Sequence, residues 1–266
     1  MSSGANIRRA FSTARPTRAF LLFAAVLLGF LYVQTPLFPA TFQAAPMLLI
    51  AAAGFCINDI FDQEQDRINH PERALSEYPA LSHLVTTTYI FLFVGSIMLI
   101  AIQPLPLAKF LWSLLFIALS NYSFIKRNFP SLKNVYIAFS STVPLAIIDF
   151  SSDELFSSPW LFAPLVLAVF ARELACDVPD INGDDATIAV RLGEGTSSRL
   201  VFACYAVSLS LLTFLSNGER QFVIAAVGWG LLALYSVFKS KYRWSERRLI
   251  LFSAPLVICP AVLVLN

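Results

Sequence analysis

Two clusters of aspartates in the sequence share one spacing, D-x2-D-x3-D. The first cluster is Asp59, Asp62 and Asp66, and the second is Asp177, Asp180 and Asp184. Positions i, i+3 and i+7 lie on one face of an α-helix. Each cluster is therefore expected to project three carboxylates in one direction from the end of a helix, although Pro179 and Gly183 indicate that the second helix breaks or ends within its cluster.

This arrangement of carboxylates predicts a metal site. Facing groups of like charge repel one another, so a cation is expected between the clusters. Oxygen ligands without histidine or thiolate suit Mg2+, which usually bridges one or two carboxylates to substrate phosphates. All six aspartates are candidate Mg2+ ligands, the implied substrate is a diphosphate, and Asp62 and Asp180 are also candidate catalytic residues.

Basic and aromatic residues that suit a diphosphate accompany the clusters. Tyr122 and Lys126 form an i, i+4 pair, in which Lys126 would hold a phosphate oxygen while the Tyr122 hydroxyl donates to the bridging oxygen. Both are therefore candidate catalytic residues. Further candidates for neutralising a leaving diphosphate are Arg67, Arg73 and Arg172. Arg67 and Arg73 fit equally well as basic anchors at a membrane surface.

Composition indicates the elements that must position these residues. The chain has 266 residues, of which 57% are hydrophobic and 14% charged, and its mean hydropathy is +0.69. Ordinary soluble domains have about 25% charged residues, so most of this chain is expected to lie in lipid. A membrane-spanning helix needs about 20 mainly apolar residues. Nine segments fit: 19–35, 44–63, 83–103, 105–124, 133–150, 159–177, 199–216, 221–239 and 248–265. The sequence thus predicts one all-α transmembrane domain over residues 1–266.

The distribution of Lys and Arg predicts the orientation of these spans. Basic residues near span ends are retained in the cytoplasm, and most of them fall on one side if the N-terminus is cytoplasmic. Both acidic clusters then lie on the cytoplasmic side. Asp177 follows Asp59 by 118 positions and four spans, which suggests two four-helix pseudo-repeats.

The two aspartate motifs resemble those of the UbiA superfamily of membrane prenyltransferases. Its first motif, N-D-x2-D-x3-D, is similar to the stretch from Asn58 to Asp66, and its second is similar to the stretch from Asp177 to Asp184. The resemblance implies a nine-helix bundle with a central cavity, capped by the cytoplasmic loops between spans 2 and 3 and between spans 6 and 7. It also implies that the carboxylates and Asn58 hold two Mg2+ ions and the diphosphate, with Lys126 and Tyr122 beside it.

The expected reaction is transfer of an isoprenoid chain from a prenyl diphosphate to a small acceptor through an allylic carbocation, with release of diphosphate. The expected acceptor is an aromatic ring, with a lipid as the other option. One alternative is a terpene cyclase, in which the substrate's own double bonds capture the cation. A transporter is a third possibility, but it predicts charges at the bilayer midplane, whereas these clusters lie at helix ends. The expected partners are the two substrates and the lipid bilayer, with no nucleic acid.

Overall fold

The computed structural model describes residues 3–151, 162–184 and 186–215, and every regular element within these ranges is a helix. In chain order they are α1 (Ser3–Thr13), α2 (Pro16–Tyr32), α3 (Leu37–Phe61), α4 (Gln63–Asn69), α5 (Ala74–Glu77), the 3-10 turn η1 (Pro79–Leu81), α6 (Ser82–Ala101), α7 (Pro106–Asn128), α8 (Lys133–Ser140), α9 (Val143–Ser151), α10 (Phe162–Asp177), α11 (Ile188–Leu192) and α12 (Glu194–Leu215). The predicted all-α class is confirmed.

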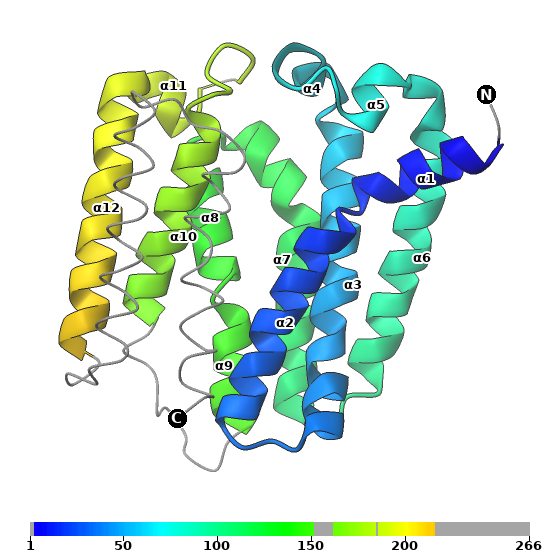
Figure 1. Ribbon diagram of the computed structural model, residues 1–266, viewed down its shortest axis with the longest axis vertical. Coiled ribbons are helices and arrows are strands. Elements are labelled where there is room, and N and C mark those ends of the chain that lie inside the picture. The colour runs from blue at the N-terminus through cyan, green and yellow to red at the C-terminus, as the bar shows by residue number, and fades with distance from the viewer. Residues whose placement is uncertain (1–2, 152–161, 185, 216–266) are drawn as a thin grey trace.

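Seven of the nine predicted spans fall wholly or mostly within the described residues, and each has a helical counterpart (Figure 1). Six of them are single helices, namely α2, α3, α6, α7, α10 and α12. The largest difference in a boundary is at α3, which begins at Leu37 rather than at residue 44, with Pro36 at its N-cap. The predicted spans 221–239 and 248–265 lie outside the described residues.

The fifth predicted span is broken into α8 and α9. Pro144 is the second residue of α9, and a proline ring clashes with the carbonyl four residues earlier, here that of Ser140, where α8 ends. The Thr142 hydroxyl donates to the Phe139 carbonyl at 2.7 Å, which satisfies one acceptor that the end of α8 leaves open. The sequence stays apolar through the break between α8 and α9, so its composition did not indicate that the helix is interrupted.

A helix that the sequence did not predict, α1, precedes the first span. It is bent by 42° relative to α2, and the bend lies next to Arg15, which has a left-handed backbone with φ 44°. Pro16 at the first position of α2 favours the restart of the helix. α1 contacts α5 and α6, and its mixture of arginines and apolar residues is typical of a helix lying along a membrane surface.

Exposed apolar side chains cover the outer surface of the bundle. On α6 and α7, Phe91 is 75% exposed, Met98 65% and Phe110 63%. Within the described ranges, three helices, α3, α6 with η1, and α7, are long and apolar enough to cross a membrane, and α1 with α2 qualifies as a bent pair. Soluble monomers seldom expose such extensive apolar surface, whereas lipid contact accounts for it.

The helices that the structure describes pack around two buried clusters. The larger includes Phe30 of α2, Ile50 of α3 and Trp112 of α7, and the smaller includes Leu174 of α10 and Val201 of α12. The division into two four-helix pseudo-repeats stays a prediction.

Both aspartate clusters lie at the same end of the bundle, which we call the acidic end. It is formed where α3 and α10 terminate, together with α4, α5 and α11 (Figure 1). The segments between spans 2 and 3 and between spans 6 and 7 thus meet at one end, as the sequence predicted.

A close approach of α2 to α9 generates a test of this packing. A Cβ added to Gly29 would overlap the Ile148 side chain, which is buried, so Gly29→Ala is expected to lower stability by about 1 to 3 kcal/mol through overpacking. Ile148→Val removes the clashing methyl group, so the double variant should recover stability in detergent-based thermal unfolding. Gly54→Ala is the control, because its nearest neighbour would be 3.9 Å away. Equal midpoints for Gly29→Ala and Gly54→Ala would contradict this packing.

Candidate active site

The first aspartate cluster lies at a helix break rather than on one continuous helix. α3 ends at Phe61, Asp62 joins the two helices, and α4 begins at Gln63. The amide of Asp62 still bonds to the Asn58 carbonyl at 2.9 Å, and that of Asp66 to the Asp62 carbonyl at 2.8 Å. The chain therefore bends while keeping helical spacing. All three carboxylates, Asp59, Asp62 and Asp66, are buried.

The second cluster extends from the end of α10 into a turn, as Pro179 and Gly183 predicted. Asp177 is the last residue of α10. The amides of Gly183 and Asp184 both bond to the Asp180 carbonyl at 3.0 Å, which holds the turn closed. Asp177 is buried, and Asp180 and Asp184 are partly buried.

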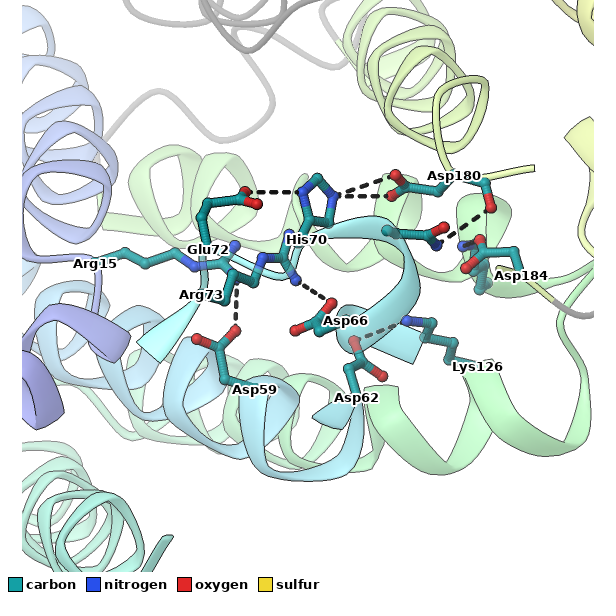
Figure 2. Close-up of polar contacts among 12 residues, drawn as sticks. Arg15, Asp59, Asp62, Asp66, His70, Glu72, Arg73, Lys126, Asp180 and Asp184 are labelled. Atoms are coloured by element: carbon teal, nitrogen blue, oxygen red, sulfur yellow. Dashed lines mark hydrogen bonds and ion pairs between the residues drawn. The ribbon is translucent and has the colours of Figure 1, made fainter. Parts of the chain in front are cut away.

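The two clusters face one another across a direct contact between their loops. The Asn69 side-chain amide donates to the Asp180 carbonyl at 3.3 Å, and His70 Nε2 lies 3.2 Å from Asp180 Oδ1. A Cβ at Gly183 would overlap the Asn69 side chain, with 2.7 Å to its Cγ. Glycine is therefore required for the loops to approach this closely, and Figure 2 shows the resulting arrangement of side chains.

Each carboxylate of the first cluster is paired with a different basic residue (Figure 2). Arg15 Nη2 lies 2.6 Å from Asp59 Oδ1, and Arg73 Nη1 lies 2.6 Å from Asp66 Oδ1. Lys126 Nζ lies 2.7 Å from Asp62 Oδ2. These three partners come from the α1–α2 break, from the residue before α5 and from the last turn of α7.

The second cluster is paired in the same manner. Buried Lys133, the first residue of α8, lies 2.8 Å from Asp177 Oδ1 and 3.2 Å from Asp184 Oδ2. The Asn134 side-chain amide donates to Asp177 Oδ2 at 2.9 Å. The hydrogen bond between His70 and Asp180 raises the pKa of the imidazole above its usual value, against the opposing effect of burial. All six aspartates thus have a basic partner.

Two of the predicted diphosphate-binding residues, Lys126 and Arg73, contact the clusters directly. Tyr122 lies one turn before Lys126 on α7. The other two predicted arginines are placed differently. Arg172 pairs with its neighbour Glu173, and Arg67 is exposed and forms no ion pair with any residue in the described ranges.

The sequence did not identify Arg15, Lys133, Asn134 or His70 as part of this site. Arg15 and Lys133 were interpreted only as basic residues that mark the cytoplasmic side. One signal was available: Lys133 and Asn134 begin the fifth span, at the same end of the bundle as both clusters.

The donor set fits a hard divalent cation. Every candidate ligand is a carboxylate or amide oxygen, which suits Mg2+. The Asn58 side-chain oxygen is buried and accepts no hydrogen bond from the described residues, so it has capacity for a ligand. No group of three acidic, histidine or cysteine side chains in those ranges is gathered as metal ligands would be; each carboxylate is engaged with a basic partner. Metal ions can therefore take the place of the basic partners beside the carboxylates, and a polyanion can take the place of the carboxylates beside the basic side chains.

Comparison with known proteins finds matches over most of the chain. The profile of the UbiA prenyltransferase family matches residues 20–254. A digeranylgeranylglyceryl phosphate synthase of Methanoregula boonei is 28% identical over 245 residues, which cover 87% of this chain and 82% of the relative. The synthase of the same name from Methanoculleus marisnigri is 33% identical over 209 residues, which are 75% of each chain.

Two solved structures share the fold at 17% identity. An apo structure of a UbiA homolog from Aeropyrum pernix K1 has a TM-score of 0.76, covering 94% of this chain and 98% of that one. A structure reported for digeranylgeranylglyceryl phosphate synthase has a TM-score of 0.66, covering 98% and 96%. The chain belongs to the UbiA prenyltransferase family and is a membrane-embedded prenyltransferase.

Proposed function

We propose that the protein transfers an isoprenoid chain from a prenyl diphosphate to a lipid acceptor in a reaction that depends on Mg2+ and occurs at the acidic end. The observation that carries this proposal is the pairing of six aspartates with basic side chains on two loops that face one another. Such a site can accept cations and a diphosphate together. The cations would neutralise the aspartates in place of their basic partners, and the released basic side chains would neutralise the diphosphate.

The proposed metal ligands are the six aspartates, with the buried Asn58 oxygen beside them. They are Asp59, Asp62, Asp66, Asp177, Asp180 and Asp184. When bound there, Mg2+ would neutralise charge on the diphosphate and so ease its departure.

The basic partners have a second role in this proposal. Lys126 is held 2.7 Å from Asp62, where it can turn to a diphosphate oxygen without leaving the site, and Tyr122 can donate a hydrogen bond from the preceding turn. Arg73 is placed to do the same from the side of Asp66. Arg67 and Arg172 complete the proposed set, and each must reorient to reach the substrate.

The names of the relatives favour a lipid acceptor over an aromatic one. The relatives' product is a glyceryl phosphate that carries two geranylgeranyl chains. Such a product arises when the bond between the prenyl carbon and diphosphate oxygen breaks, the acceptor oxygen bonds to that carbon, and its proton passes to solvent. Here the acceptor captures the allylic cation, so a cyclase is less well supported.

We further propose that the acidic end and the N-terminus are cytoplasmic. Lys126, Lys133, Arg15 and Arg73 all lie at that end, and basic residues near span ends are retained inside. Their contacts with aspartates support a role for these residues in the site as well as in the topology.

Asp62→Asn and Asp180→Asn are each expected to abolish transfer, because each removes a proposed metal ligand while keeping the size of the side chain. Product formation in reconstituted membranes measures the effect, and circular dichroism checks that the helices persist. Glu64→Gln, an exposed acid in α4, is the matched control and should stay active. Normal turnover by Asp62→Asn would refute the two-cluster site.

Exhaustive chelation is expected to stop transfer, and added Mg2+ or Mn2+ to restore it, because all the proposed ligands are oxygen atoms. Helix content should survive chelation, since the protein's own basic side chains neutralise the aspartates. Transfer rate and circular dichroism are measured on one sample. Undiminished turnover without divalent cations would show that the carboxylates do not bind a metal ion that the reaction requires.

Lys126→Gln is expected to slow the single-turnover rate by about 100-fold or more at saturating diphosphate, because a donor to the departing charge is lost. Lys126→Arg should be intermediate, since it keeps the charge but not the compact shape. Arg127→Gln is the control, because Arg127 is the exposed neighbour. If Lys126→Gln matches that control, the lysine only marks the topology.

A further inference from the structure

Lys133 is more deeply buried than the basic residues that pair with the first aspartate cluster. Its side chain is 5% exposed. The corresponding values are 19% for Arg15, 26% for Arg73 and 16% for Lys126. A buried charge that leaves its partner loses the interaction that offset the cost of its burial. Lys133 therefore has less freedom than these three residues to turn away from the aspartates.

The ammonium group of Lys133 also contacts two carboxylates. Its Nζ lies 2.8 Å from Asp177 Oδ1 and 3.2 Å from Asp184 Oδ2, and the two aspartate side chains are 8% and 6% exposed. Mg2+ binds oxygen ligands at about 2.0 to 2.1 Å. An ion that bridged the same two oxygens would therefore stand where the ammonium group stands, so the two cations exclude one another at this position.

The segment that carries Lys133 is fastened to the second acidic loop on both sides of the lysine. The Ser131 hydroxyl donates to the Ala186 carbonyl at 2.9 Å. The Asn134 side-chain amide donates to Asp177 Oδ2 at 2.9 Å, so both oxygens of Asp177 have a partner at the start of α8. These contacts hold the backbone of the segment beside the loop, which keeps the ammonium group at the cluster.

Asp180, the remaining member of the second cluster, is more accessible to a metal ion. Its side chain is 23% exposed, and its partner is His70, at 3.2 Å. Mg2+ usually keeps several waters and binds one or two carboxylates together with substrate phosphates. Asp180 and the first cluster therefore offer enough carboxylates for one such ion without those that Lys133 contacts.

We propose that Lys133 is a permanent cation of the site and takes the place of one of the two Mg2+ ions that the aspartate motifs imply, so that a single Mg2+ accompanies the diphosphate. Lys133 is thus the basic partner that Mg2+ does not displace. Asp177 and Asp184 hold the lysine, and the ligands of the single ion come from Asp180 and the first cluster. This inference rests on the proposed function and narrows its set of metal ligands.

The test counts the metal ions bound by the full chain, reconstituted in phosphatidylcholine bilayers with Mn2+ and a prenyl thiodiphosphate, whose carbon–sulfur bond resists cleavage. Equilibrium dialysis gives the number of ions per chain. Electron paramagnetic resonance shows whether two Mn2+ ions lie close enough for their spins to couple. The parent protein is expected to bind one Mn2+ without spin coupling, and two coupled ions would overturn the inference.

Variants assign the count to Lys133. Lys133→Met keeps the length of the side chain but removes its charge, so it is expected to bind two Mn2+ ions and to show the coupled spectrum. Lys126→Met is the matched control and should stay at one ion, because Lys126 pairs with Asp62, a proposed ligand of the single ion. Asp177→Asn should keep one ion near the parent affinity, whereas Asp180→Asn should weaken Mn2+ binding about tenfold or more.

Circular dichroism of each variant separates a lost site from a lost fold. A single ion in folded Lys133→Met, or loss of the ion from folded Asp177→Asn, overturns the inference. If Lys133→Met does not fold, the counts in the parent protein and in Asp177→Asn, which both keep the lysine, decide. The proposed function is tested apart from this: a parent protein that binds no Mn2+ beside the thiodiphosphate refutes the metal-dependent reaction, whereas two ions refute only the role of Lys133.

Discussion

Carboxylates at the end of a membrane-spanning bundle are costly unless a positive charge lies beside each of them. The six aspartates of the acidic end meet this requirement with five basic residues, Arg15, His70, Arg73, Lys126 and Lys133. The partners come from separate parts of the chain, so neutralising the aspartates also fixes the positions of α1, α7 and α8 relative to the two acidic loops. Charge pairing thus organises this end of the molecule.

The helical spans were predictable because their signal is local. A run of about 20 apolar residues indicates a span whatever the rest of the chain does, and α6 and α7 follow their predicted ranges closely. The break between α8 and α9 needed attention to Pro144 within an apolar run. α1 was missed because it has 11 residues and a mixed polar sequence, whereas the prediction of a span requires a run of about 20 apolar residues. Its packing against α5 and α6 is a tertiary property.

The candidate site was predictable in part. Repeated aspartate spacing identified both clusters, but the assumption of one continuous helix was wrong at Asp62, where the chain bends. The sequence identified Arg73 because it lies close to the first cluster along the chain. It identified Lys126 because the end of its span lies at the same depth as the clusters. Arg15 pairs with Asp59 across 44 positions, and no local pattern reveals which distant arginine will do so. A basic residue at the end of a span can mark the cytoplasmic side or pair with a carboxylate of the site, and only the fold distinguishes the two.

The contact between Gly183 and Asn69 has an evolutionary consequence. A side chain at 183 would occupy the space that the Asn69 amide uses to reach the Asp180 carbonyl. Replacing glycine by a larger residue is therefore tolerated only if a smaller residue stands at position 69 or the loops separate. The two positions are 114 residues apart in the chain, yet they should covary among descendants of this gene, with the acidic end as the structure that selection preserves.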